Sequence, residues 1–561
     1  MTNALPINSG NSDKDKPEDV PSLAARPSAS FRWLPYVLAL AVVGYWLLVK
    51  SVLFHRLEYT SDLISNLQLS RSVFEGRPLL WENQFGDHKA LHNFYIAVLH
   101  YPLTRFLGAY GLFIAQALLL ASAVYMILNR ARDAAEWKRL LYWAAMAALV
   151  LGPVSFWIFD NPLMGFHYEL LFVPLSVLFA LSLSKRSKLA WLFAGLIILT
   201  REEGAVVAWC IHVLHEVFNA EPGTRDGNVR ARLFRRLAWI TLGWLLVFIA
   251  GMGLLVTMGA SSHGRLGSVM PRVRVLIEDP TTRFVLFSSL VDVALLLAAG
   301  GLVYLAGIPR RGLIASALIS VVLIVPLTVA SAYYGSTGLR DLGLAWAPRF
   351  AMLWGIALVG CLFAIERARA PSVVASRRLR VAAIAVAASI VSQIAVLGVR
   401  RHYDFVSRIT LQAFFAPTSL IALVLPRSTV QDYLSRPRFV AAALSDSEND
   451  FLTCLGRELP HETPVTSTGT LFGRFHRQDL LWAYSLDIAW KPPVVVVCDE
   501  AGRGPGISEN GCLKLAHSLS NASYQTLQLG QLLVRYTSGP KAIVEACAAR
   551  SAPAASPAGR R

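Results

Sequence analysis

The sequence predicts an all-α polytopic membrane domain of about 11 to 12 transmembrane helices, followed by a C-terminal soluble α/β domain. Of the 561 residues, 55% are hydrophobic and only 16% are charged, whereas about a quarter of a soluble protein is usually charged. Apolar runs approaching the roughly 20 residues that cross a bilayer recur as far as residue 425. Further on, Pro493–Asp499 is an apolar, β-branched run ended by an acid, which is typical of a central strand in an α/β sheet.

Eleven apolar runs are expected to form the membrane-spanning helices. The first seven are Trp33–Phe54, Gly108–Leu128, Leu140–Phe159, Leu170–Ser184, Leu189–Thr200, Ala205–Phe218 and Leu237–Met258. The other four are Phe284–Ala306, Leu313–Tyr334, Phe350–Ile365 and Val381–Val399. A twelfth run, Ile409–Leu425, contains Pro417 and either lies in the membrane interface or crosses the bilayer.

The net charge of +17 is distributed in a way that predicts the orientation of these spans. Lys and Arg gather in the loops at 130–139, 185–188, 225–236, 310–311 and 367–380, which are alternate connections along the chain. Cytoplasmic loops collect basic residues, so the N-terminus is expected in the cytoplasm and the first loop outside, in a cell inner (plasma) membrane. The basic charge therefore indicates topology and contact with membrane lipid, and no nucleic-acid partner is expected.

The chain divides into two folded parts with flexible ends. Residues 1–30 are expected to form a disordered cytoplasmic tail, 31–425 the transmembrane domain, with a first outer loop at 55–106, and 548–561 a disordered tail. Residues 426–547 are expected to form the soluble α/β domain, with strands at Pro464–Ser467 and Pro493–Asp499 and a strand pair within Gln525–Thr537. An odd number of spans puts this domain outside, periplasmic or extracellular, as we favour; a twelfth span would put it inside.

Four cysteines lie in the C-terminal part of the chain, where an oxidising compartment would allow disulfides. They are Cys454, Cys498, Cys512 and Cys547. Because Cys498 and Cys512 flank a Gly-rich stretch, they form the most plausible pair.

Polar residues in the first outer loop form the first candidate site. Asp62 follows the first span, and His88, Lys89 and His92 precede the second. Ionisable groups beside hydrocarbon are costly and usually have a use. Asp62 also begins a segment with apolar residues at helical spacing, which predicts a helix along the membrane surface. An acid in the first turn could simply complement the helix dipole.

Two further charged groups are expected at outer ends of spans. They are His167 with Glu169, and Arg201 with Glu202 and Glu203. A structural turn, or a hydrogen bond to a neighbouring helix, would explain each group equally simply. The His and carboxylate side chains are also donor types that a divalent metal ion takes, but their spacing matches no zinc motif. A metal cofactor and its identity therefore stay open.

In their order along the chain, these residues resemble a family of bacterial and archaeal membrane proteins, domain of unknown function 2079. The shared features are Asp62, His92 followed by Pro102, Gln116, the Phe166-His167-x-Glu169 motif and the basic-acidic-acidic step at Arg201. The resemblance covers most of residues 55 to 500. This family in turn looks like the C-class membrane glycosyltransferases, in which an essential Asp lies in the first outer loop and a basic step between the fifth and sixth spans meets the lipid phosphate.

The resemblance implies transfer of a sugar from a polyprenyl-phosphate carrier to an envelope acceptor on the outer face, with inversion. Asp62 would be the catalytic base, and Arg201 and Lys89 would bind the phosphate of the lipid carrier. The residues left to position the acceptor or a metal ion are His88, His92, His167, Glu169, Glu202 and Glu203. Two alternatives stay open: a transporter or flippase of lipid-linked precursors without catalytic activity, and a structural protein whose outer domain binds a partner.

Overall fold

The computed structural model describes most of the N-terminal half and much of the C-terminal part of the chain. The described residues are 33–55, 57, 59, 61–83, 86–87, 92–151, 165–220, 227–258, 278, 351–367, 444–468, 471–481, 492–500, 508–519 and 523–551. The structure is mostly helical, with a C-terminal α/β part.

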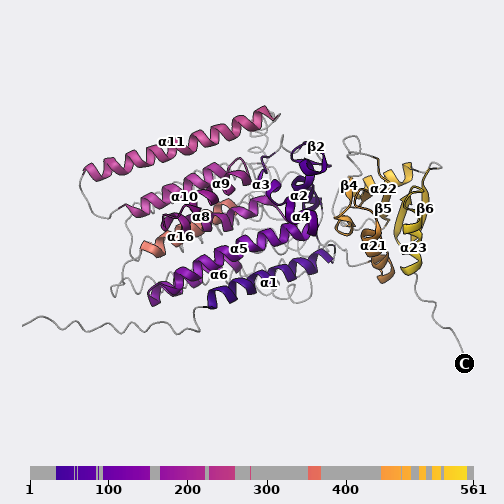
Figure 1. Ribbon diagram of the computed structural model, residues 1–561, viewed down its shortest axis with the longest axis horizontal. Coiled ribbons are helices and arrows are strands. Elements are labelled where there is room, and N and C mark those ends of the chain that lie inside the picture. The colour runs from indigo at the N-terminus through magenta and orange to yellow at the C-terminus, as the bar shows by residue number, and fades with distance from the viewer. Residues whose placement is uncertain are drawn as a thin grey trace, which may run out of the picture.

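Long helices lie side by side in the N-terminal part (Figure 1). They are α1 (Leu34–His55), α5 (Ala109–Arg132), α6 (Glu136–Leu151), α8 (Phe172–Ser184), α9 (Leu189–Thr200), α10 (Gly204–Asn219), α11 (Gly227–Thr257) and α16 (Ala351–Arg367). Helix α5 packs against α1, α6 and α8, and α16 packs against α6, α8 and α10. Their apolar side chains share one hydrophobic core, because each run is too apolar to leave all its faces exposed.

The segment between α1 and α5 consists of short elements at one end of these helices (Figure 1). They are α2 (Ser61–Arg71), the 3-10 helix η2 (Ser72–Glu75), β1 (Trp81–Glu82), β2 (Gly86–Asp87), α3 (Ile96–Leu99) and α4 (Tyr101–Leu107). The predicted helix after Asp62 is present, but Leu63 and Leu67 are each only 1% exposed. Leu63 and Leu67 pack in the core of the long helices and Ile64 in that of the C-terminal part, so the apolar face of α2 meets protein and does not lie in lipid head groups as predicted.

The C-terminal part is a five-stranded sheet with helices. Its elements are α21 (Asp446–Glu458), β3 (Pro464–Ser467), η9 (Leu471–Phe475), β4 (Asp479–Leu481), β5 (Val495–Asp499), α22 (Ser508–Ser518), β6 (Gln525–Leu529), β7 (Leu532–Tyr536) and α23 (Lys541–Ser551). The strand order is β4-β3-β5-β7-β6, with β4, β3 and β5 parallel and β7 and β6 antiparallel. Helix α23 continues four residues past the predicted end of the domain at 547, and 552–561 lie outside the described residues.

Two disulfides hold this part together. Cys498 in β5 pairs with Cys512 in α22, as the sequence predicts. Cys454 in α21 pairs with Cys547 in α23, which joins the first helix of the domain to its last.

The C-terminal domain is seated on the first loop through apolar contacts. Leu57 and Ile64 belong to the same buried cluster as Phe451, Phe472 and Phe475 of the C-terminal domain. Side chains of the loop therefore complete the core of a domain some 400 residues away in the sequence, and the domain lies on the same side of the helices as the loop.

Polar contacts fix the register of this docking. The carbonyl oxygen of Leu480, on edge strand β4, accepts hydrogen bonds from Gln68 Nε2 at 2.6 Å and from Asn83 Nδ2. Arg77 and Asp479 form an ion pair in which the two side chains are only 7% and 6% exposed. These contacts satisfy an edge strand that would otherwise be open to another chain.

The 3-10 helix η9 and the residue that follows it contact the ends of two long helices. Arg474 Nη2 donates to the carbonyl oxygen of His55, the last residue of α1, at 2.8 Å. His476 Nδ1 accepts from the backbone N–H of Ala109, the first residue of α5, at 3.3 Å. Both bonds satisfy backbone groups that helix ends leave without partners. Gly108 has φ +58°, and a Cβ there would overlap His476 Nδ1, so the close approach requires glycine.

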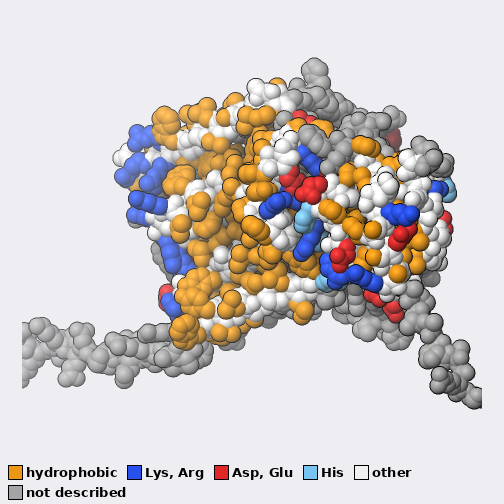
Figure 2. Space-filling view, turned by 45° about the vertical axis from the view of Figure 1, so that its right-hand side comes forward, with side chains coloured by type: hydrophobic (Ala, Val, Ile, Leu, Met, Phe, Trp, Pro, Cys, Tyr) orange, Lys and Arg blue, Asp and Glu red, His pale blue; other side chains and the backbone are white. Residues whose placement is uncertain are grey.

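The opposite end of the helices is basic. Glu366, near the end of α16, pairs with Arg130 at 3.3 Å and accepts from Lys138 Nζ through its carbonyl oxygen at 2.9 Å. Arg236, in the first turns of α11, pairs with Glu216 near the end of α10 at 3.1 Å. Figure 2 shows Lys and Arg gathered at this end, with a broad hydrophobic surface between them and the C-terminal domain.

The predicted spans that fall on described residues are helical. The bounds of α9 agree with Leu189–Thr200, and α10 and α16 differ by one or two residues at each end. Among the described residues, Ala109–Arg132 and Ala231–Thr257 are long and apolar enough to cross a membrane. The spans at Phe284–Ala306, Leu313–Tyr334, Val381–Val399 and Ile409–Leu425 lie outside the described residues. The polytopic membrane class therefore stays a prediction.

Candidate functional site

An arginine at the end of α9 lies at the centre of a charged cluster. Helix α9 ends at Thr200, and Arg201 has an extended backbone that turns its side chain into the protein, where it is only 3% exposed. Its guanidinium pairs with Glu169, on the 3-10 helix η4 (Tyr168–Leu171), and with Glu203 at 2.9 Å. His167 Nδ1 contacts the other oxygen of the Glu169 carboxylate.

Glu202 joins this cluster to the segment before α3. Its carboxylate accepts from the backbone N–H of Asn93 at 3.2 Å and contacts His92 Nδ1 at 3.0 Å. Arg201 Nε lies 3.6 Å from Glu202 and Arg201 Nη2 lies 3.5 Å from His92 Nε2. Burial by itself would raise the pKa of the Glu202 carboxyl, but His92 and Arg201 outweigh burial and hold that pKa well below its usual value.

The cluster has more acid than base. Three carboxylates, from Glu169, Glu202 and Glu203, surround one guanidinium and two imidazoles. The side chains of Glu169 and Glu202 are 2% and 4% exposed, whereas that of Glu203 is 38% exposed. The cluster is therefore closed on the protein side and meets solvent at Glu203.

Asp62 is tied to this cluster through its own helix. Asn66 Nδ2, one turn further along α2, donates to the carbonyl oxygens of both Asp62 and Phe166, at 2.7 and 3.0 Å. The Tyr168 hydroxyl in turn donates to the carbonyl oxygen of Asn66 at 3.0 Å. The partly exposed Asp62 therefore begins a helix that is bonded to the segment carrying His167.

The structure brings most of the predicted site residues together. His92, His167, Glu169, Arg201, Glu202 and Glu203 form one set of contacts, and the side-chain amide of Asn66 links the backbone carbonyl of Asp62 to that of Phe166, the residue before His167. His88 and Lys89 lie outside the described residues. The sequence patterns do not single out Asn66 or Asn93 as site residues. The signal for Asn66 is a polar residue four positions, or about one helical turn, after Asp62.

Lys50 is a buried lysine that the sequence patterns also do not single out, and it holds the segment that begins at Gly165. Lys50 Nζ, in α1, donates to the carbonyl oxygen of Gly165 and lies over the rings of Tyr59 and Phe113, 5.0 and 4.8 Å from their centroids. Such contacts stabilise a cation that has left water. A lysine inside an apolar run was the available signal, because such a charge seldom lacks a role.

A metal ion is not supported by the part of the cluster that the structure describes. Within the described ranges, no group of three or more His, Cys, Asp or Glu side chains has the arrangement of a metal site. The carboxylates of the cluster instead face Arg201 and the two histidines, so we derive no step through a metal ion.

Comparisons with protein-family models, with curated proteins and with solved structures found no match for this chain. The resemblance to domain of unknown function 2079 and to the C-class membrane glycosyltransferases therefore stays a prediction.

Proposed function

We propose that this chain is an integral-membrane glycosyltransferase. It transfers a sugar from a polyprenyl-phosphate carrier to an envelope acceptor on the outer face of the inner (plasma) membrane. The observation that carries the proposal is the convergence of Asp62, His92, His167, Glu169 and the step at 201–203 at one end of the helices.

The distribution of charge supports membrane insertion with this end outside. The basic residues of the described loops gather at the far end of the helices (Figure 2), as cytoplasmic loops do. Helix α11 exposes a row of large apolar side chains that lipid would cover, among them Phe234, Trp239, Leu242 and Ile249. The two disulfides of the C-terminal domain, which sits at the same end as the cluster, fit an oxidising outer compartment.

Asp62 would act as the general base. Its carboxylate takes the proton of an acceptor hydroxyl as that oxygen bonds to the anomeric carbon of the sugar. The bond from the anomeric carbon to the phosphate oxygen breaks on the opposite face, and the polyprenyl phosphate leaves with the electron pair. Asn66 and the segment at Phe166 hold the first turn of α2, and thus Asp62, in place.

Arg201 would neutralise the departing phosphate after exchanging a partner. Its partner Glu169 is buried, whereas Glu203 reaches solvent and can turn away at little cost. An incoming phosphate would therefore replace Glu203 on the guanidinium, as Arg pairs with phosphate as readily as with carboxylate. His92, His167 and Glu202 would hold Arg201 in its orientation during this exchange.

The alternative is a transporter or flippase of lipid-linked precursors. A carrier would need polar groups along a path through the bilayer, and buried Lys50 and Gln116 are such groups. The ionisable cluster, however, lies at helix ends: after Thr200, before Gly204 and before Tyr168. This placement favours chemistry at the membrane surface over passage through it.

The proposal is tested first by binding of the carrier. The full chain, purified in nanodiscs of phosphatidylcholine, is titrated with polyprenyl phosphate. The variants are Arg201→Gln, Glu203→Gln and Asp62→Asn, with Arg235→Gln at the basic end as a matched control.

We expect Arg201→Gln to abolish measurable binding, because it removes the cation that meets the phosphate. Glu203→Gln should tighten binding severalfold, because it removes the carboxylate that competes with the phosphate for the guanidinium. Asp62→Asn and Arg235→Gln should bind as the wild type does. Unchanged binding in Arg201→Gln, or weaker binding in Glu203→Gln, would remove Arg201 from this role.

A further inference from the structure

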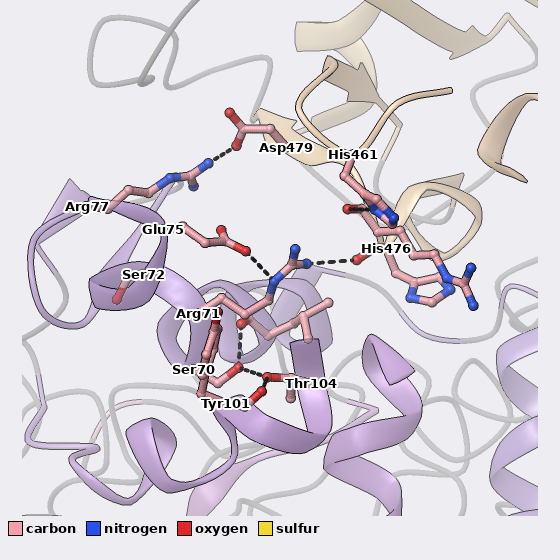
Figure 3. A network of polar contacts seen from close by, with 12 residues as sticks. Ser70, Arg71, Ser72, Glu75, Arg77, Tyr101, Thr104, His461, His476 and Asp479 are labelled. Atoms are coloured by element: carbon pink, nitrogen blue, oxygen red, sulfur yellow. Dashed lines mark hydrogen bonds and ion pairs between the residues drawn. The ribbon is translucent and has the colours of Figure 1, made fainter. Parts of the chain in front are cut away.

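Basic side chains from three parts of the sequence gather where the C-terminal domain meets α1 and α5. We name them the outer basic cluster: His55, Arg71, His461, Arg474, His476 and Arg477. Arg71 Nη1 donates to the carbonyl oxygen of His476 at 3.5 Å, and His461 Nδ1 contacts the carbonyl oxygen of Arg477 at 3.2 Å. Figure 3 shows the guanidinium of Arg71 reaching the backbone carbonyl of His476, with His461 on the same side of the junction as His476. This cluster is separate from the candidate site around Arg201.

Charge in the outer basic cluster is not balanced. Arg71 pairs with Glu75 at 2.6 Å, and Arg474 donates to the neutral amide oxygen of Asn449 at 2.5 Å. Arg477 is exposed, and the carboxylate next to His461 in the sequence, Glu462, is exposed as well. Among the described residues Arg71 has a carboxylate partner, whereas Arg474 and Arg477 form no ion pair, so the cluster carries net positive charge even with all histidines neutral. An anion would lower the free energy of this arrangement.

The outer basic cluster lies at the depth where the proposed spans end. His55 is the last residue of α1, and His476 accepts from Ala109, the first residue of α5. Tyr110, on the next position of α5, places its hydroxyl 3.0 Å from His55 Nε2. Tyrosine beside basic side chains is typical of the level of lipid head groups.

Exposed apolar side chains accompany these charges on the short elements before α5. Phe74 is 50% exposed and stacks on Tyr101 with ring centroids 3.9 Å apart, and Tyr101 begins α4. Leu99 and Phe106 are 55% and 80% exposed. Apolar side chains with cations beside them match the boundary between acyl chains and head groups, where each kind of group finds its partner.

We propose that the outer basic cluster binds the phosphate of an anionic phospholipid head group, with the exposed aromatic side chains entering the acyl region beside it. Exposed Arg477 meets the phosphate, Arg71, 11% exposed, adds positive potential beneath it, and the lipid seals the junction between the C-terminal domain and the membrane. This inference rests on insertion of the helices in a bilayer and is independent of sugar transfer.

The test counts lipids bound to the full chain. The purified protein in mild detergent is titrated with phosphatidylglycerol or phosphatidylcholine, and retained lipid is measured by native mass spectrometry. Arg477→Gln removes one charge, and Arg477→Lys keeps it. The matched control is Arg457→Gln, because Arg457 is 65% exposed on the same domain and is already paired with Glu458.

We expect wild type to retain phosphatidylglycerol in preference to phosphatidylcholine. Arg477→Gln should weaken phosphatidylglycerol binding about fivefold, the effect of about one surface charge, whereas Arg477→Lys and Arg457→Gln should bind as wild type. Equal retention of both lipids, or an equal loss in Arg457→Gln, would overturn the proposal.

Two further arms separate this site from the carrier site. Arg201→Gln should keep phosphatidylglycerol binding while it loses polyprenyl phosphate, so failure of one proposal leaves the other standing. If polyprenyl phosphate displaces phosphatidylglycerol in Arg201→Gln, the outer basic cluster belongs to the carrier and the phospholipid assignment is wrong.

Discussion

Replacement of Arg201 by methionine tests whether the charged cluster is a closed, mutually compensating set. Methionine replaces the aliphatic stem of the side chain but removes the guanidinium, which leaves the carboxylates of Glu169 and Glu202, 2% and 4% exposed, without their cation. Removing one partner of a buried ion pair lowers the free energy of unfolding by about 3–5 kcal/mol. His167 and His92 still contact these carboxylates, so we expect a loss near the lower end, about 3 kcal/mol.

The remaining histidines give this variant a characteristic pH dependence. The variant should regain part of its stability between pH 8 and pH 6, because a proton taken up beside Glu169 or Glu202 supplies positive charge that Arg201 no longer provides, whereas wild type keeps its guanidinium at both pH values. Glu169→Gln should cost less than Arg201→Met, because Arg201 keeps Glu202 and Glu203 as partners.

Equilibrium unfolding in detergent, followed by tryptophan fluorescence at both pH values, measures these differences. The control is Arg457→Gln, whose side chain is 65% exposed and whose ion pair with Glu458 should contribute about 0–1 kcal/mol. If Arg201→Met costs no more than this control, or if its loss is the same at pH 6 and pH 8, the cluster is not the compensating set described above.

Three predictions concern the docking of the C-terminal domain. Burial first, and then the neighbouring cations, lower the pKa of His476 to about 3, so its stabilising contribution is complete above about pH 6.5 and is lost as the pH falls toward 3. Hydrogen exchange of the Ala109 amide should therefore accelerate on acidification, and a rate independent of pH after correction for intrinsic exchange would contradict this. Gly108→Ala should weaken docking by about 1–3 kcal/mol through overlap with His476, seen as faster proteolysis of the C-terminal domain; an unchanged rate would show that the contact is loose. Asp479→Asn leaves the buried Arg77 without its carboxylate and should cost about 3–5 kcal/mol in unfolding free energy, whereas a loss below 1 kcal/mol would mean that the pair is open to water.

Local sequence patterns predicted the elements well where the pattern had only one explanation. The run Leu189–Thr200 lies between Lys188 and Arg201, and α9 has these bounds, because charged residues end a buried apolar run. Strand β3 likewise agrees with Pro464–Ser467, and the strand pair within Gln525–Thr537 is β6 and β7.

The surroundings of α2 could not be predicted in the same way. Its apolar positions fit a helix on a membrane surface as well as a helix covered by protein, and only the contacts of Ile64 and Gln68 with the C-terminal domain decide between them. Those contacts join residues about 400 positions apart, and no local pattern encodes them. Residue types identified the candidate site, but the pairing of Arg201 with Glu169 needed the fold, because η4 and the end of α9 meet only in three dimensions.

The most direct test of sugar transfer is mass spectrometry of envelope glycans and lipid-linked sugars in a strain that lacks this chain, complemented with wild type or Asp62→Asn at equal membrane levels. The proposal predicts that an envelope glycan loses a sugar while its polyprenyl-phosphate donor accumulates, and that wild type restores the glycan but Asp62→Asn does not. Glycans that are unchanged by the deletion, or fully restored by Asp62→Asn, would contradict it.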